Sequence, residues 1–119
     1  ILVGVTILTS LNENNLVDLG FNSSAEEIAI KLAKLGKQNG VDGVVCSIED
    51  ISGIKASLGG DFLSVTPGVR MSQDNDDQKR SGSIYNAIQF GTDFVVVGRE
   101  ITQAKNPEGV LKKIESLIV

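Results

Sequence analysis

The segment best suited to binding an anion is Val95–Arg99, in which a run of valines ends at Gly98 and Arg99. A glycine lets a ligand approach the backbone N–H groups, and the planar guanidinium group of an arginine can form paired hydrogen bonds with a phosphate. We therefore interpret Gly98 and Arg99 as candidate phosphate ligands. Taken alone, this segment is equally compatible with a tight turn followed by a solvated arginine.

Two further groups of polar residues follow an apolar segment at Phe62–Thr66. Pro67 and Gly68 set a sharp exit from that segment and direct Arg70 outward, although a simple turn is the better explanation when this motif is taken alone. Gln78 lies in the charged cluster Asp77–Arg80, and a lone cluster of this kind is usually just solvated. The whole stretch Pro67–Ser81 is long and polar, as in a lid or a disordered insert. Its place after an apolar segment on the presumed active face favours a lid, which we expect to be mobile without ligand.

Thr9 and Ser10 close the first apolar segment of the chain. Their hydroxyl groups are suited to binding the edge of a heterocycle, and equally to capping the next turn. Asp42 and Asp93 each come just before an apolar segment, where carboxylates are expected to stabilise the fold and not to act in chemistry. The single cysteine, Cys46, lies in an apolar run, so it cannot form an internal disulfide and is expected to be a reduced core residue.

Other kinds of chemistry are excluded or disfavoured by composition. The chain has no histidine, which removes Ser-His and Cys-His nucleophile pairs and imidazole metal ligands. The net charge of −4 argues against nucleic acid, although a few local cations can still hold a small anion. No run is long enough to span a membrane and no signal peptide is visible, so we expect a cytoplasmic protein. Because the chain starts at Ile1 and enters an apolar stretch at once, we expect sequence to be missing upstream.

The elements that must position these residues alternate between short apolar strands and amphipathic helices. The expected strands are Leu2–Leu8, Val41–Cys46, Phe62–Thr66 and Phe94–Val97. The expected helices are Ala25–Gln38, Asp50–Leu58, Ser83–Phe90 and a last one capped by Asn106. In the first helix the expected buried stripe is Ala25, Ile28, Ala29, Leu32 and Leu35. Such alternation predicts an α/β fold with a parallel sheet.

Four strand–helix units form either a small open sheet or half of an eight-unit (β/α)8 TIM barrel. The first strand is not followed by a glycine-rich dinucleotide fingerprint. The polar residues instead cluster after the carboxyl ends of all four strands, where barrel enzymes place their sites. We therefore predict four parallel strands, adjacent in chain order and curved as half a barrel, with their carboxyl ends on one rim.

Five segments, in this order and spacing, resemble the orotidine 5'-phosphate decarboxylase family: Val5–Ser10, Asp42–Ser47, Val65–Arg70, Asp77–Arg80 and Val96–Thr102. The resemblance covers essentially the whole chain and implies that residues 1–119 are the C-terminal half of a single TIM-barrel domain, with strands five to eight. It implies decarboxylation of orotidine 5'-phosphate to UMP without a cofactor or metal, by a homodimer. The site residues that it implies are phosphate ligands Arg70, Gln78, Gly98 and Arg99, pyrimidine contacts Thr9 and Ser10, and Pro67 lining the base pocket.

The family's catalytic Asp-x-Lys-x-x-Asp motif, at the end of the third strand, has no counterpart here. The closest approach begins at Asp77 but has Gly82 where the final aspartate should be. The resemblance therefore implies that the catalytic groups belong to a missing N-terminal half, and that this chain alone is inactive. Two alternatives stay open: a related metal-dependent barrel, such as a hexulose-phosphate synthase or β-keto acid decarboxylase, and a non-catalytic phosphate-binding half barrel.

Overall fold

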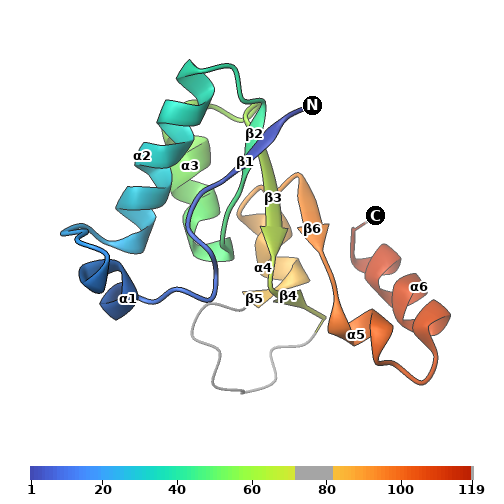
Figure 1. Ribbon diagram of the computed structural model, residues 1–119. Helices are drawn as coiled ribbons and strands as arrows, with labels where there is room; N and C mark the ends of the chain where they lie inside the picture. Colours follow the sequence, from blue (N-terminus) through green and yellow to red (C-terminus); the bar gives the residue numbers. More distant parts are fainter. Residues whose placement is uncertain (72–81, 119) are drawn as a thin grey trace.

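A computed structural model describes residues 1–71 and 82–118 of the chain (Figure 1). Its main sheet has four strands: β1 (Val3–Val5), β2 (Gly43–Val45), β3 (Leu63–Pro67) and β6 (Phe94–Val96). All neighbouring pairs are parallel, and the order across the sheet follows the chain. The predicted parallel sheet with sequential strands is therefore confirmed, and the carboxyl ends of its strands lie at one edge.

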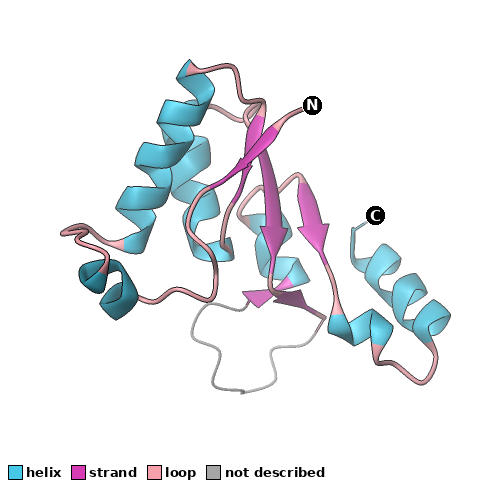
Figure 2. Ribbon diagram, viewed as in Figure 1, coloured by secondary structure: helices cyan, strands magenta, loops and turns pink. Residues whose placement is uncertain are grey.

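The helices pack on one face of this sheet and beyond its ends (Figure 2). They are α1 (Glu13–Asp18), α2 (Ala25–Gln38), a 3-10 turn η1 (Ile48–Asp50), α3 (Ile51–Leu58), α4 (Ile84–Gln89), α5 (Arg99–Thr102) and α6 (Pro107–Ile118). Ser24 caps α2 through a reciprocal capping box with Glu27. Asn106 accepts a hydrogen bond from the Gly109 N–H at the start of α6, which confirms the predicted cap. Among the described residues, no helix is long and apolar enough to cross a membrane.

Helix α2 approaches the sheet through its smallest residues. Its buried side chains are alanines, with one isoleucine: Ala25, Ile28, Ala29 and Ala33. Leu32 and Leu35, which the sequence stripe places in the core, are exposed to 36% and 56%. The three alanines recur every four residues and share one face, so the helix axis can come close to the strands and the leucines are turned outward. The predicted stripe is thus right at its beginning and wrong at Leu32 and Leu35.

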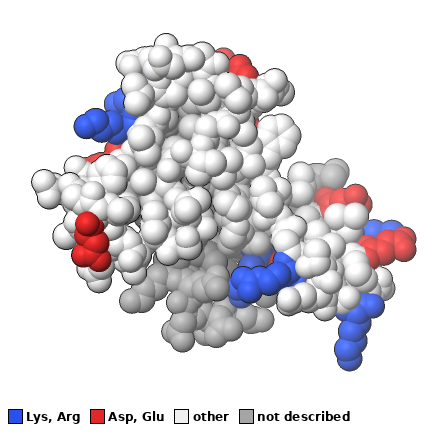
Figure 3. All heavy atoms as spheres, in the orientation of Figure 1, with Lys and Arg blue, Asp and Glu red and all other residues white. Residues whose placement is uncertain are grey.

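The main core lies between the sheet and α2, α3, α4 and α6. Its most buried members include Val44, Cys46, Ile51, Ile54, Ile84, Ala87 and Ile114. The opposite face of the sheet carries a second apolar row, because Val5, Val45, Val65 and Phe94 are aligned by the strand register. At the two edges this row is open, with Val5 exposed to 60% and Phe94 to 54%. Figure 3 shows almost no charged side chain over the strands on this face.

Carboxylates at the amino ends of the strands hold the sheet together. Asp93 accepts hydrogen bonds from the Lys55 ammonium group (2.6 Å) and from the backbone N–H (2.8 Å) and hydroxyl (3.1 Å) of Ser64. Asp42 accepts one from the backbone N–H of Leu2 (2.6 Å). Burial alone would raise the pKa of Asp93, but the bonds from Lys55 and Ser64 outweigh it and lower that pKa. These contacts agree with the structural role expected for both aspartates.

Replacing Asp93 by asparagine should therefore lower the free energy of unfolding at pH 7 by about 1–2 kcal/mol, because the Lys55 and Ser64 donors lose a charged acceptor. Since folding lowers the Asp93 pKa, this contribution is present above the unfolded pKa of about 4 and is lost as the pH falls through the lowered pKa. Urea unfolding at pH 7 and in acid would measure both effects. Asp61→Asn, at an exposed position on the same side of the sheet, is the matched control. Equal effects of the two substitutions would contradict the assignment.

Candidate phosphate and pyrimidine site

The carboxyl end of β3 turns sharply before the first candidate arginine. Gly68 has a φ of +73°, a conformation that residues with a Cβ atom adopt only under strain. The turn leads into β4 (Val69–Arg70), which pairs in parallel with β5 (Gly82–Ser83). Part of the predicted irregular stretch Pro67–Ser81 is therefore regular structure, and the β4–β5 pair holds the backbone of Arg70.

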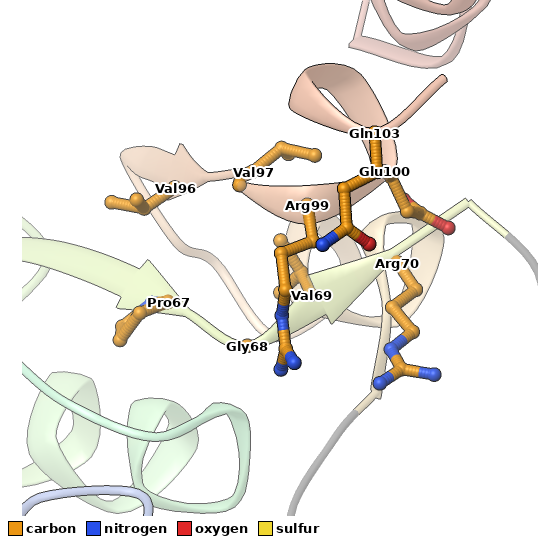
Figure 4. Close-up of a pocket in the computed structure, with 10 residues that line it drawn as sticks. Pro67, Gly68, Val69, Arg70, Val96, Val97, Arg99, Glu100 and Gln103 are labelled. Carbon is orange, nitrogen blue, oxygen red and sulfur yellow. The ribbon is translucent and has the colours of Figure 1, made fainter. Parts of the chain in front are cut away.

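Arg70 and Arg99 line the same cavity, although they follow different strands. The cavity has a volume of about 510 Å³ and lies at the carboxyl ends of β3 and β6. In Figure 4 the guanidinium groups of both arginines extend toward the same side of this cavity. Figure 3 likewise shows basic side chains gathered near α5 at this rim. The cavity is lined by Pro67, Gly68, Val69, Arg70, Val96, Val97, Gly98, Arg99, Glu100 and Gln103.

Gly98 contributes an open stretch of backbone to this cavity. A Cβ atom built at this position would meet no other atom within 4 Å. In the described part of the chain, no backbone carbonyl group accepts a hydrogen bond from the N–H of Gly98 or of Arg99. An anion beside these groups can therefore accept hydrogen bonds from the backbone and from the Arg99 side chain together.

Thr9 and Ser10 line a second, smaller hollow of about 100 Å³, together with Pro67 and Cys46. Their hydroxyl groups do not cap the following helix, because the cap of α1 is Asn12, which pairs reciprocally with Asn15. Pro67 borders both this hollow and the larger cavity. The structure thus brings together Thr9, Ser10 and Pro67 in one place, and Pro67, Arg70, Gly98 and Arg99 in another.

Some predicted features fall outside these two hollows. Gln78, the cluster Asp77–Arg80 and the central part of the predicted lid lie outside the described residues. Within the described part of the chain, no lysine lines either hollow, and no group of three or more His, Cys, Asp or Glu side chains could hold a metal ion. Lys55 donates to Asp93 and to two backbone carbonyl groups at the opposite side of the sheet.

Sequence reasoning missed Glu100 and Gln103 as residues of the cavity. Gln103 lies four positions after Arg99, a spacing that returns to the same side of a helix, so the pattern could have indicated it. Glu100 directly follows Arg99, and its carboxylate accepts a hydrogen bond from the backbone N–H of Met71 at 3.1 Å. This contact joins residues 29 positions apart, which no local pattern reveals.

Cys46 is almost fully buried in the main core, as predicted, and forms no disulfide. Burial and the nearby charge of Asp50 raise the pKa of its thiol from 9.0 to about 12. The thiol is therefore neutral and protonated at physiological pH, which leaves it a packing residue with little nucleophilic character.

Alkylation of Cys46 by iodoacetamide at pH 8 should accordingly be at least about a hundredfold slower in the folded chain than in urea, because the thiolate is the reactive form. The free energy of unfolding should also fall above about pH 8.5, where the unfolded thiol ionises and the folded one does not. Labelling reports on this residue alone, because the chain has one cysteine. Equal labelling rates with and without urea would show that the site is not closed.

Parallel strands in chain order, with two arginines and an open glycine backbone at their carboxyl ends, define a portion of a β/α barrel whose candidate site lies at the carboxyl-end rim. The chain belongs to the orotidine 5'-phosphate decarboxylase / HUMPS family, whose model matches residues 1–114.

Its similarity to individual relatives is substantial but covers only part of each. It is 42% identical over 116 residues to the orotidine 5'-phosphate decarboxylase of Neisseria meningitidis serogroup A, covering 96% of this chain and 47% of the relative. It is 46% identical over 115 residues to that of Vibrio parahaemolyticus, covering 96% and 49%. The chain therefore spans about half the length of the curated relatives it matches.

The fold is similar to solved structures of enzymes with the same name. The crystal structure of orotidine 5'-phosphate decarboxylase from Lactobacillus acidophilus matches with a TM-score of 0.79 and 32% identity, over 95% of this chain and 46% of that one. That from Sulfolobus solfataricus matches with a TM-score of 0.63 at 19% identity, which shows the fold alone. These matches confirm the predicted half barrel.

Proposed function

We propose that this chain is the phosphate- and pyrimidine-binding half of an orotidine 5'-phosphate decarboxylase. The observation that carries the proposal is the position of Pro67, which borders both the cavity of Arg70 and Arg99 and the hollow of Thr9 and Ser10. A nucleotide with its phosphate against the two arginines has its base directed toward the two hydroxyl groups. Membership of the family supports this assignment.

The catalytic groups belong, in this proposal, to a polypeptide segment that supplies strands one to four. There a lysine between aspartates delivers the proton to C6 after the C6–carboxylate bond breaks, so that orotidine 5'-phosphate and a proton become UMP and CO2. Residues 1–119 then form the C-terminal half of one barrel domain, which works as a cytoplasmic homodimer. The apolar row from Val5 to Phe94 becomes part of the closed barrel interior.

This half contributes to the rate through a part of the substrate that does not react. Binding energy from the remote phosphate can lower the reaction barrier if it is realised only in the closed complex, and not merely strengthen substrate binding. Arg70 and Arg99 hold the phosphate dianion with charge-assisted bonds, and the open Gly98 backbone adds N–H donors. Thr9 and Ser10 orient the pyrimidine, and Pro67 fixes the wall between the two parts of the site.

Arg99→Ala in the complete enzyme should lower kcat/KM by at least about tenfold, because a hydrogen-bonded charged contact contributes about 1.5–3 kcal/mol. Steady-state kinetics with orotidine 5'-phosphate measure the change. Lys105→Ala removes an exposed cation a few residues away and should leave kcat/KM unaltered. An Arg99→Ala enzyme with wild-type kcat/KM would remove this residue from the phosphate site.

The purified 119-residue chain should not decarboxylate orotidine 5'-phosphate by itself, because it lacks the proton-donating lysine. Adding a polypeptide with strands one to four of a relative should restore turnover, and it should also improve solubility by covering the open sheet edges and the apolar row. Turnover by this chain alone would contradict the proposal.

Activity of the complemented barrel that persists in EDTA is expected, whereas its loss would favour a metal-dependent barrel of the same family. A complemented barrel that binds UMP but never turns over would indicate a non-catalytic module.

A further inference from the structure

Glu100 is an acidic side chain in a cavity whose other charged side chains are Arg70 and Arg99. It directly follows Arg99 in α5 and lines the same cavity as Arg70 and Arg99 (Figure 4). Its two carboxylate oxygens lie 3.1 and 3.3 Å from the backbone nitrogen of Met71, which donates to them. Glu100 is only partly exposed, so this contact is shielded from water more than a surface contact would be. A carboxylate in this place opposes the binding of a phosphate dianion, so its presence calls for a compensating role.

The contact with Met71 supplies that role. Met71 follows Arg70 in the chain, so the bond fixes the backbone next to the arginine. On the other side, pairing of β4 with β5 places Arg70 beside Ser83. The backbone at Arg70 is therefore held by the β4–β5 pair and, through the neighbouring Met71, by Glu100, which connects the two arginine-bearing segments. Without this connection, the separation of the two guanidinium groups would depend on the short β4–β5 pair and on the contacts of the Arg70 side chain.

We propose that Glu100 is a positioning residue, which ties Arg70 to the Gly98–Arg99 end of the phosphate site while its charge limits the affinity for the phosphate group. This inference rests on the proposed function, because it assumes that the cavity binds a nucleoside monophosphate. Position and charge act in opposite directions on the same ligand. Removing the charge alone should therefore raise the affinity, and removing the hydrogen bond as well should lower it again, a pair of effects that neither a purely electrostatic nor a purely structural role produces.

The test compares three variants of the barrel formed by this chain and a complementing first half, with UMP as the probe in calorimetric titrations. Glu100→Ala removes both the hydrogen bond to Met71 and the charge, and its Kd for UMP should be about threefold to tenfold higher than that of Glu100→Gln, as expected for loss of a hydrogen bond. Glu100→Gln keeps an oxygen that accepts the Met71 N–H but removes the charge, and should lower the Kd by about twofold to fivefold. Glu108→Gln removes an exposed charge on α6, where Glu108 pairs with Lys112, and should leave the Kd unchanged.

Equal Kd values for Glu100→Ala and Glu100→Gln would overturn the inference, because the carboxylate would then act only through its charge. A Kd for Glu100→Gln at or above that of the wild type would overturn it as well, because the charge would then not limit the affinity. The inference would also be overturned if Glu108→Gln lowered the Kd as much as Glu100→Gln does. The effect would then come from the net charge of the protein and not from the position of Glu100.

A second measurement tests the hydrogen bond between Glu100 and Met71 without any ligand. Hydrogen exchange of the Met71 amide, followed by NMR in the complemented barrel with only this chain 15N-labelled, should be faster in Glu100→Ala than in the wild type and close to wild type in Glu100→Gln. Equal exchange in all three proteins would show that Glu100 does not hold Met71. If the wild-type complemented barrel fails to bind UMP, the proposed function is wrong, and the Met71 amide still reports separately on the tie.

Discussion

The parallel register between β3 and β6 is the constraint on which the rest of the site depends. It sets Pro67 opposite Val96, so that the residues following each strand emerge side by side at one edge of the sheet. Asp93 reinforces this register from the other end of the strands, because its carboxylate binds both the backbone and the hydroxyl of Ser64. A shift of one residue would turn every side chain of β6 to the opposite face and separate Arg99 from Arg70. The contacts that secure the binding edge therefore lie at the far end of the sheet.

Much of this arrangement is encoded locally and could be predicted from the sequence. Apolar segments of the right length, separated by capped helices, define parallel strands, and in such a sheet the residues after each strand must meet at one edge. That reasoning places Arg70 with Gly98 and Arg99, and it places Thr9 and Ser10 on the same edge. Gln78, which the family resemblance adds to the phosphate ligands, lies outside the described residues and stays a prediction.

What the sequence did not reveal depends on contacts between distant segments. The bond between Glu100 and Met71 arises only after the chain has turned at Gly68, and the segment Val96–Thr102 that contains Glu100 gives no sign of Met71 as its partner. The stripe of α2 was mispredicted for a related reason, because hydrophobicity alone favours Leu32 and Leu35 while close packing favours the alanines beside them. Small residues decide how near a helix can approach a sheet, and only the assembled layers show which side they occupy.

The proline shared by the two hollows has a consequence for ligand length. The ring of Pro67 fixes its φ angle, so the wall between the hollows is stiffer than one made by a residue that rotates freely. A ligand that fills both hollows must therefore have a linker long enough to pass this wall, and the length required is nearly constant. In the proposed nucleotide site, a free base or a free phosphate would occupy only one of the two hollows. A molecule that carries both groups would then be favoured over either group alone only if its linker matches the separation that Pro67 imposes.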